Sequence, residues 1–360
     1  MEENKLYIED LKNTIRSTNN IEELRNKTIF ITGANGLIGS FIIDVIMYLN
    51  VVEDFNTVII ANARSLAKLN KRFSLYRQNS LFQPYICDIN QTIDYDGRVD
   101  YIINCASNTH PLQYATKPIE TIMTNIDGTS NVLDFAAKIG AKKTLFLSSV
   151  EIYGENTNNI ERFKETDMGY IDCNSLRSGY NEAKRCAEAL CQAYIEQNGI
   201  DVSILRLPRI YGPTVKADDT KVISQFIFKA INGEDIVLKS SGEQFFSFLY
   251  VADAVSGILT CLINGEKGEV YNLGNIDSDV RIKDLARIVA EEVGVEVVFE
   301  TPDSIESKGY SKATIARLDY SKITNDLNWE PLYSIEDGVR KTIKILKNDL
   351  HSGQGNETEK

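Results

Sequence analysis

A tyrosine and a lysine, Tyr180 and Lys184, stand four residues apart in a segment of helical length. At that spacing two side chains lie on the same face of a helix. A phenol with a pKa of about 10 is a poor base at neutral pH, but a neighbouring ammonium group favours the phenolate and lowers that pKa. The pair therefore predicts a base that removes a hydroxyl proton, with Lys184 as its electrostatic partner.

Two residues upstream could complete this site. Ser149 and Glu151 follow the apolar run at 144–148, and ligands bind at the carboxyl ends of strands in parallel sheets. Ser149 could hydrogen-bond a substrate oxygen, and the Glu151 carboxylate suits general acid/base work. The predicted catalytic residues are Ser149, Glu151, Tyr180 and Lys184.

A glycine-rich turn follows the apolar run at 28–32 and opens an apolar segment of helical length. The first glycine permits a tight turn, the second leaves room for a pyrophosphate, and the third lets the helix pack closely on the strand. This context predicts a bound dinucleotide, held at the turn by Gly33, Asn35, Gly36, Leu37, Ile38 and Gly39.

The elements that must position these residues are short apolar runs separated by helix-length segments. The runs lie at 28–32, 57–61, 84–88, 101–106, 144–148 and 202–206, and the helical segments include 119–139 and 176–198. Continuous apolar strands alternating with helices predict an α/β fold, a Rossmann-type doubly wound parallel sheet.

After about residue 208 the pattern changes to a smaller C-terminal α/β lobe, with helices predicted at 221–232 and 282–293 around a strand region at 236–251. We expect an N-terminal extension (1–26), a dinucleotide-binding domain (27–208), a partly interleaved substrate lobe (209–347) and a disordered tail (348–360).

Composition excludes several classes of function. The chain has 39 Lys and Arg against 51 Asp and Glu, a net charge of −12, which argues against a nucleic-acid surface. No run approaches the roughly 20 apolar residues of a membrane span, and the acidic N-terminus is not a secretory signal. Six cysteines without a CxxC pair, and only two histidines, indicate reduced thiols in a cytoplasmic protein without a metal site.

The GxxGxxG spacing resembles the short-chain dehydrogenase/reductase superfamily. Further matches are the stretches 125–129, 206–213, 250–253 and 327–331. Over roughly residues 27–345 the chain resembles an extended member of the NAD-dependent epimerase/dehydratase family, which acts on nucleotide sugars. The resemblance implies that Tyr180 is the base, that Lys184 also binds a ribose, and that Ser149 binds the reacting hydroxyl.

The resemblance also implies further cofactor contacts, with Asp88 and Ile89 at the adenine and Ala106 at the edge of the sheet. Asn62 could bind a ribose hydroxyl, whereas Arg64 could meet a 2′-phosphate. NAD is therefore the expected cofactor, with NADP left open by Arg64.

Such relatives oxidise carbon 4 of the sugar to a transient ketone, after which epimerisation, loss of water across carbons 5 and 6, or decarboxylation can follow. Glu151 stands where 4,6-dehydratases and UDP-glucuronate decarboxylases have glutamate, so elimination is favoured over 4-epimerisation. Val150 replaces an aspartate of the dTDP-glucose enzymes, and segment 105–133 is similar to the decarboxylases. A 4-ketosugar reductase and a non-catalytic dinucleotide-sensing protein are less favoured interpretations of the same fold.

The substrate contacts implied by the resemblance are Ser107, Ser149, Arg177, Arg209 and Tyr211. Phe246 stands where most relatives have an arginine that grips the diphosphate, so we expect Arg209, Lys216 or Lys221 to replace that charge. Relatives pack the Tyr-Lys helix against a second copy, which predicts a homodimer. A row formed by Ala183, Ala187, Leu190 and Tyr194 could serve either the core or that interface.

Overall fold

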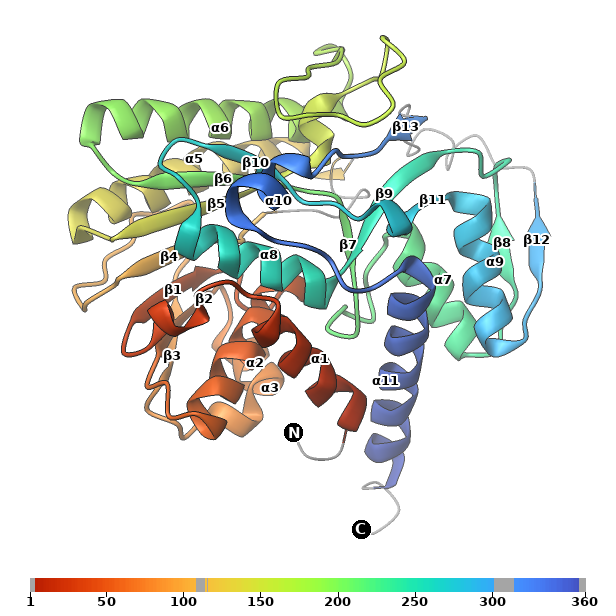
Figure 1. The fold of residues 1–360 in the computed structure, drawn as a ribbon, viewed down its shortest axis with the longest axis horizontal. Helices are drawn as coiled ribbons and strands as arrows, with labels where there is room; N and C mark the ends of the chain where they lie inside the picture. The colour runs from red at the N-terminus through yellow and green to blue at the C-terminus, as the bar shows by residue number, and fades with distance from the viewer. Residues whose placement is uncertain (1–3, 108–113, 115, 301–313, 356–360) are drawn as a thin grey trace.

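The computed structural model describes residues 4–107, 114, 116–300 and 314–355, and the side chains of 351–355 are not described. The chain forms two lobes, joined along one side by helices from both ends of the sequence (Figure 1).

The larger lobe is built on seven parallel strands in the order β10-β6-β5-β4-β1-β2-β3. The strands are β1 (Thr28–Thr32), β2 (Val58–Ala63), β3 (Phe82–Ile86), β4 (Tyr101–Asn104), β5 (Lys143–Ser149), β6 (Val202–Leu207) and β10 (Val270–Asn272). The central strands β1, β4 and β5 are apolar runs that are buried on both faces. The predicted Rossmann-type parallel sheet is confirmed.

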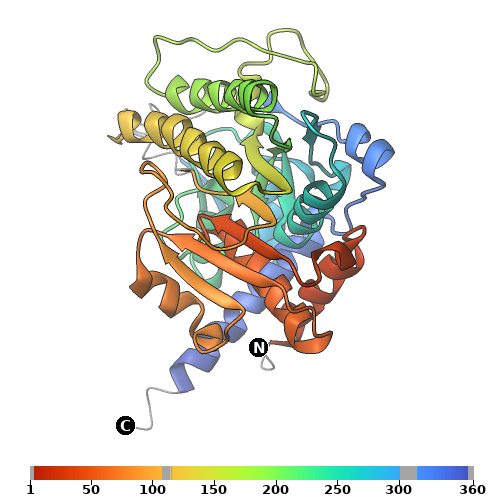
Figure 2. The same ribbon diagram turned by 90° about the vertical axis from the view of Figure 1, so that its left-hand side faces the viewer.

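Helices cover both faces of this sheet. Helices α5 (Pro118–Ile139) and α6 (Ser178–Asn198) lie on one face, and α2 (Leu37–Val52) lies on the other together with α8 (Val251–Asn264). Figure 2 shows the layers edge-on, with α5 in yellow and α6 in green on one side of the strands and the red and orange N-terminal helices on the other. The short α3 (Leu66–Arg72) packs near β3.

The smaller lobe holds a four-stranded mixed sheet and a separate strand pair. The sheet joins β7 (Arg209–Tyr211), β9 (Phe245–Tyr250), β11 (Asp279–Arg281) and β13 (Ile315–Ala316), and β8 (Ile236–Leu238) pairs with β12 (Val297–Phe299). The helices of this part of the chain are α7 (Val222–Ile231), α9 (Ile282–Val293), α10 (Ser321–Leu327) and α11 (Ile335–Gly355). Helix α9 has the bounds that the apolar periodicity predicts.

The single boundary expected at residue 208 is interrupted in the structure, as the expected interleaving of the substrate lobe allows. Residues 251–272 return to the larger lobe, where α8 packs on α2 and β10 adds the seventh strand. The expected disordered tail also begins too early, because α11 continues to Gly355. Residues 356–360 of that tail lie outside the described residues.

The N-terminal extension is part of the folded body. Its helix α1 (Lys5–Arg16) is followed by a short 3₁₀ turn, Ile21–Leu24. Helix α1 packs against α2, α8 and α11, with Leu11 fully buried. It therefore contacts helices that come from both halves of the sequence.

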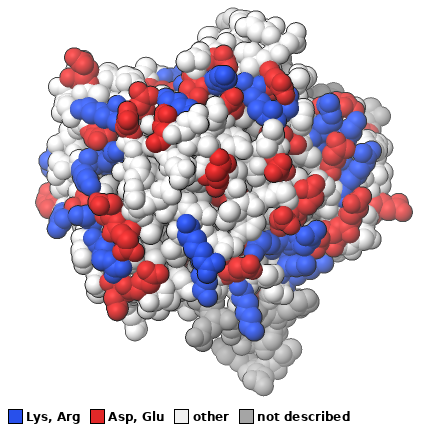
Figure 3. Space-filling model, viewed as in Figure 1, with Lys and Arg blue, Asp and Glu red and all other residues white. Residues whose placement is uncertain are grey.

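Acidic and basic side chains are interspersed on the face of the molecule shown in Figure 3. Among the residues that the structure describes, no helix is both long and apolar enough to cross a membrane.

Candidate active site

The carboxyl ends of β1, β4 and β5 meet at one edge of the large sheet, because the three strands are parallel neighbours. The glycine turn follows β1, Ala106 and Ser107 follow β4, and Ser149 ends β5. The Thr32 hydroxyl donates to Asn104 Oδ1 at 2.8 Å and accepts from the Ala106 N–H at 2.9 Å, which ties two of these strand ends together. Residues far apart in the sequence thus share one edge.

The glycine turn is tightly packed against the neighbouring strand ends and leaves no room for side chains at its glycines. Gly33 has a φ of +64°, and a Cβ there would lie 3.0 Å from the Ala106 Cα atom. A Cβ on Gly39 would lie 2.7 Å from the Gly33 carbonyl oxygen. Gly36 caps α2 without a side chain, so no side chain of the cap competes for the amides at this helix N-terminus. These residues fit a dinucleotide cofactor, with Asn35, Leu37 and Ile38 completing the turn.

The other expected cofactor residues differ in how available they are. Asp88 is half-buried and accepts from the Asn90 N–H at 3.0 Å, and Ile89 is buried. The Asn62 amide is buried and donates to the Cys87 carbonyl oxygen at 3.1 Å, so its nitrogen holds β2 to the chain after β3. Arg64 is exposed and lies 3.7 Å from the Glu120 carboxylate. The ribose and adenine contacts stay predictions.

Tyr180 and Lys184 lie on the buried face of α6, as their spacing predicts. The side chains of Ser149, Ser107 and Tyr114 lie close enough to the Tyr180 hydroxyl to lower its pKa. The Lys184 ammonium donates to the Leu147 carbonyl oxygen at 2.8 Å. The predicted base Tyr180, Lys184 and the strand-end Ser149 are therefore brought together.

The pKa of Tyr180 in the protein without ligands is raised, whereas the sequence predicts that Lys184 lowers it. Burial raises the pKa of Tyr180 to about 12, although the nearby Ser149 side chain acts in the opposite direction. Burial also lowers the pKa of Lys184 to about 8. Removal of both groups from water disfavours their charged forms, so the chain by itself does not produce the lowered tyrosine pKa expected from the lysine.

Glu151 lies on a 3₁₀ turn (Val150–Tyr153) directly after Ser149, whose hydroxyl accepts from the Glu151 N–H at 3.3 Å. Asn181, next to the base on α6, donates to the Glu151 carbonyl oxygen at 2.8 Å. The Glu151 carboxylate lies 3.3 Å from Arg209 Nη2, and its charge raises the pKa of Tyr180 as a secondary effect after burial. The carboxylate is therefore part of the cluster around the base.

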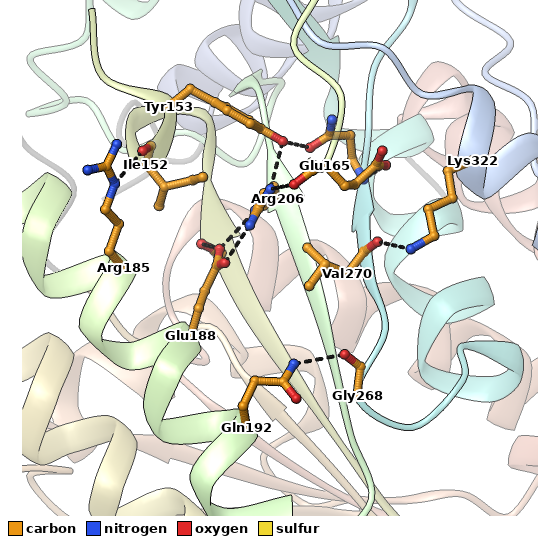
Figure 4. A network of polar contacts seen from close by, with 12 residues as sticks. Ile152, Tyr153, Glu165, Arg185, Glu188, Gln192, Arg206, Gly268, Val270 and Lys322 are labelled. Carbon is orange, nitrogen blue, oxygen red and sulfur yellow. Dashed lines mark hydrogen bonds and ion pairs between the residues drawn. The ribbon is translucent and has the colours of Figure 1, made fainter. Parts of the chain in front are cut away.

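A buried network behind α6 holds this turn in place (Figure 4). Arg206 of β6 makes two hydrogen bonds with the Glu188 carboxylate, at 2.7 and 3.1 Å, and donates to the Tyr153 hydroxyl at 2.9 Å. Arg185 of α6 donates to the Ile152 carbonyl oxygen at 2.7 Å. The helix that carries Tyr180 and the turn that carries Glu151 are thus bound to each other and to the sheet.

Two arginines stand near this cluster. Arg209 lies over the ring of Phe246, with 3.6 Å from its guanidinium carbon to the ring centre. The positive charge of Arg177 lies close enough to lower the pKa of both Arg209 and Tyr114. Two other cations were expected to replace the missing arginine. Lys221 pairs with Asp219 at 3.5 Å. Burial lowers the pKa of Lys216, with smaller effects from the charges of Asp218, Lys68 and Arg64.

Tyr211 packs within the core of the protein. It is buried, its hydroxyl donates to the Ile335 carbonyl oxygen at 3.3 Å, and its ring packs on Tyr250. Its ring therefore packs between β9 and the start of α11, and the contact with a substrate stays a prediction.

The row on α6 serves the core. Ala183 and Ala187 are buried, and the Tyr194 hydroxyl donates to Asp134 of α5 at 2.8 Å. Leu190 packs in the same apolar cluster as Ala187. This row therefore faces the body of its own chain.

Two residues of the site were missed from the sequence. Tyr114 stacks on Tyr180 with ring centres 4.7 Å apart and planes at 15°, and no spacing pattern points to it. Asn181 is adjacent to the base in sequence, so the motif region contained it, but its bond to Glu151 depends on how the turn meets the helix.

Known proteins resemble this chain over most of its length. The sequence model of the NAD dependent epimerase/dehydratase family matches residues 29–274. UDP-glucuronic acid decarboxylase 6 of Arabidopsis thaliana is 32% identical over 326 residues, covering 87% of each chain. UDP-glucuronic acid decarboxylase 1 of Xenopus tropicalis is 30% identical over 341 residues, covering 94% of this chain and 76% of that protein.

The fold matches solved structures of related enzymes. A UDP-glucose 4-epimerase from Thermotoga maritima superimposes with a TM-score of 0.75 at 24% identity, over 90% of this chain and 99% of the other. A dTDP-glucose 4,6-dehydratase from Bacillus anthracis, in complex with NAD, gives a TM-score of 0.73 at 21% identity, over 90% and 98%.

These comparisons confirm the expected fold class, the NAD dependence and the enzyme class, and they favour the interpretation as a nucleotide-sugar enzyme. On the sequence match and the fold together, the chain belongs to the NAD-dependent epimerase/dehydratase family.

Proposed function

We propose that this enzyme converts a nucleotide sugar through a transient 4-keto intermediate and then carries out an elimination, either decarboxylation or 4,6-dehydration. The observation that carries the proposal is the Glu151 carboxylate, held among the residues around Tyr180 and paired with Arg209 at 3.3 Å. The relatives named as UDP-glucuronic acid decarboxylases support decarboxylation of a UDP-linked hexuronic acid as the first choice.

The first chemical task falls to Tyr180, which takes the proton from the 4-hydroxyl of the sugar. The hydroxyls of Ser149 and Ser107 lie near the Tyr180 oxygen and are suited to orient the reacting sugar oxygen. Gly33, Gly36 and Gly39 would hold the diphosphate of NAD, and Lys184 its ribose. Bound NAD would supply the hydride acceptor for carbon 4 and would return that hydride to the sugar after the elimination, so that no NADH accumulates. Its positive ring would also favour the tyrosinate.

The second task falls to Glu151. A ketone at carbon 4 makes a carboxylate at carbon 6 part of a β-keto acid, so the bond between carbons 5 and 6 can break and release carbon dioxide. The electron pair of the broken bond between carbons 5 and 6 moves to the oxygen on carbon 4, and the resulting enolate needs a proton at carbon 5. Glu151 is positioned to deliver that proton, and in a 4,6-dehydration it would act on carbons 5 and 6 instead.

We further propose a homodimer in the cytoplasm. The α6 row packs inside its own chain. Exposed apolar side chains on α5 and just before α6 include Ile119, Met123 and Leu176, at 76%, 40% and 71% exposure. Large exposed apolar residues grouped on neighbouring segments favour a protein contact. All six cysteines are free thiols, which suits a reducing compartment.

A panel of UDP-, dTDP-, GDP- and CDP-sugars tests the proposal. NAD-loaded protein is incubated with each compound and the product masses are measured by mass spectrometry. We expect loss of carbon dioxide from UDP-glucuronic acid, or loss of water from a neutral hexose, without net NADH. A product of unchanged mass with inverted carbon 4 would favour the 4-epimerase, and stoichiometric consumption of NADH would favour the ketosugar reductase.

A further inference from the structure

Arg209 is a cation with unused hydrogen-bonding capacity beside the proposed base. Its Nη2 atom lies 3.3 Å from Glu151 Oε1. Its Nη1 atom is buried and has no hydrogen-bond partner among the residues that the structure describes. Buried donors are almost always satisfied in folded proteins, so an unpaired one at a catalytic cluster indicates a partner that arrives with the ligand.

The guanidinium is held rigidly by its neighbours. It lies 3.6 Å above the centre of the buried Phe246 ring, and strand β7 that carries it pairs with β9, which carries Phe246. Stacking on an aromatic face and a bond to a carboxylate fix the plane of the group on two sides. Its remaining donors therefore have a set direction before any substrate binds.

The charges around Arg209 leave the cluster positive. In the described part of the chain, Glu151 is the one carboxylate within bonding distance, whereas Arg177 adds a second positive charge that acts on Arg209 and on Tyr114. Burial lowers the pKa of Arg209, yet an arginine stays protonated at neutral pH. A planar donor group with excess positive charge is complementary to a carboxylate, which offers two acceptor oxygens in one plane.

We propose that Arg209 is a specificity-determining residue, which binds a carboxylate on the sugar and makes the enzyme select an acidic nucleotide sugar over its neutral counterpart. The contact with Glu151 places the guanidinium at the reacting end of the sugar. The inference rests on the proposed function, since it assumes that the sugar lies beside Tyr180 and Glu151. The sequence expectation that Arg209 grips the diphosphate is the opposing outcome.

Binding measurements separate the two roles. The probes are UDP-glucuronic acid, UDP-glucose and UDP, titrated calorimetrically into NAD-loaded protein that carries Tyr180→Phe to prevent turnover. Arg209→Gln and Arg209→Lys are compared on this background. Arg281→Gln is the matched control, because Arg281 also stacks on a phenylalanine of β9, with its guanidinium carbon 5.0 Å from the centre of the Phe245 ring.

Arg209→Gln should weaken binding of UDP-glucuronic acid by about 10- to 100-fold, with UDP and UDP-glucose changed less than about threefold. Arg209→Lys should fall between, because an ammonium cannot stack and make two parallel bonds. Thermal melts of each variant identify misfolding, and Arg281→Gln should bind all three probes like the parent.

Equal losses for UDP and UDP-glucuronic acid would overturn the proposal in favour of a diphosphate role. The proposal is also wrong if the parent protein does not prefer the acid, or if neither arginine variant alters its binding. Failure of the proposed function is read separately, from the product masses of the wild-type enzyme.

Discussion

Two acidic side chains of this protein, Asp10 and Glu151, stand in opposite polar surroundings. Asp10, on helix α1, is fully buried and its carboxylate is saturated. It accepts from the hydroxyls of Tyr250 and Tyr333, the latter at 3.1 Å, and pairs with the Lys341 ammonium at 3.0 Å. Glu151 is partly open, and the arginine that it contacts has a buried nitrogen without a partner in the described part of the chain.

The Asp10 network joins elements from distant parts of the sequence. Tyr250 ends β9, Tyr333 precedes α11 and Lys341 lies within α11, while Thr14 of the same helix as Asp10 donates to the Ala252 carbonyl oxygen of α8 at 3.1 Å. Helix α1 therefore connects the two lobes through hydrogen bonds that leave nothing for a ligand.

The contrast teaches which polar clusters serve structure and which serve chemistry. A saturated buried network stabilises the fold, and removal of one member leaves the others unpaired. An unsaturated cluster contributes less to stability and keeps its donors for a substrate. Mutations in the two clusters should therefore act on different observables.

The largest effect on activity should follow Tyr180→Phe. Loss of the hydroxyl removes the base, so kcat should fall by about 10³-fold or more, while folding and NAD binding are retained. Steady-state assays and NAD titration measure the two. Substantial residual turnover would contradict the assignment of the base. Tyr194→Phe is the matched control, because it removes from the same helix a hydroxyl that bonds Asp134 outside the site.

Glu151→Gln should come next. The amide preserves size but cannot transfer a proton, so product formation by elimination should fall by about 10²-fold or more. The free energy of unfolding should change by less than about 1 kcal/mol because the side chain is partly exposed. If 4-epimerisation at an unchanged rate were the observed reaction of the variant, elimination would be wrong.

Asp10→Ala should show the reverse pattern. Removal of the buried carboxylate takes away the partner of the Tyr250 hydroxyl and one of the two partners of Lys341 and of Tyr333, which keep Glu9 and Asn13. This loss should cost about 2–3 kcal/mol of unfolding free energy. The folded fraction should keep kcat within about threefold. Urea unfolding and active-site titration measure both, and a large loss of kcat in fully folded protein would erase the distinction between the two clusters.

Lys184→Met should give the smallest and most diagnostic effect on stability. Burial lowers the pKa of Lys184 from its ordinary 10.5 to about 8, so the folded state binds fewer protons than the unfolded state between those pH values. The contribution of Lys184 to the wild-type unfolding free energy should therefore become more favourable as the pH rises from 8 to 10.5.

At pH 7 the lysine is protonated in both states and the desolvation penalty is complete. Lys184→Met should then stabilise the inactive protein by about 1–2 kcal/mol, and this advantage should shrink towards pH 10. Urea unfolding at the two pH values tests the sign, with the exposed Lys138→Met as control. An equal advantage at both pH values would contradict the shifted pKa.

Much of this molecule follows from local sequence alone. Short apolar runs predicted six of the seven strands of the parallel sheet, all but β10, and several of the helices, because alternation of apolar runs with helical segments has few compact solutions. The glycine turn, Ser149 and the Tyr180–Lys184 pair were predictable for the same reason, since each depends on spacing within one element or at its end.

Tertiary structure decided what depends on contacts between distant segments. It returned residues 251–272 to the large sheet, placed α1 between the lobes, and buried Tyr211 in the core. It also set Arg209 against Phe246 and Glu151, which come from three separate elements. The side-chain types and the spacing of apolar residues can be read from neighbouring positions in the sequence. Burial, charge partners and unsatisfied donors are determined only when distant segments pack together.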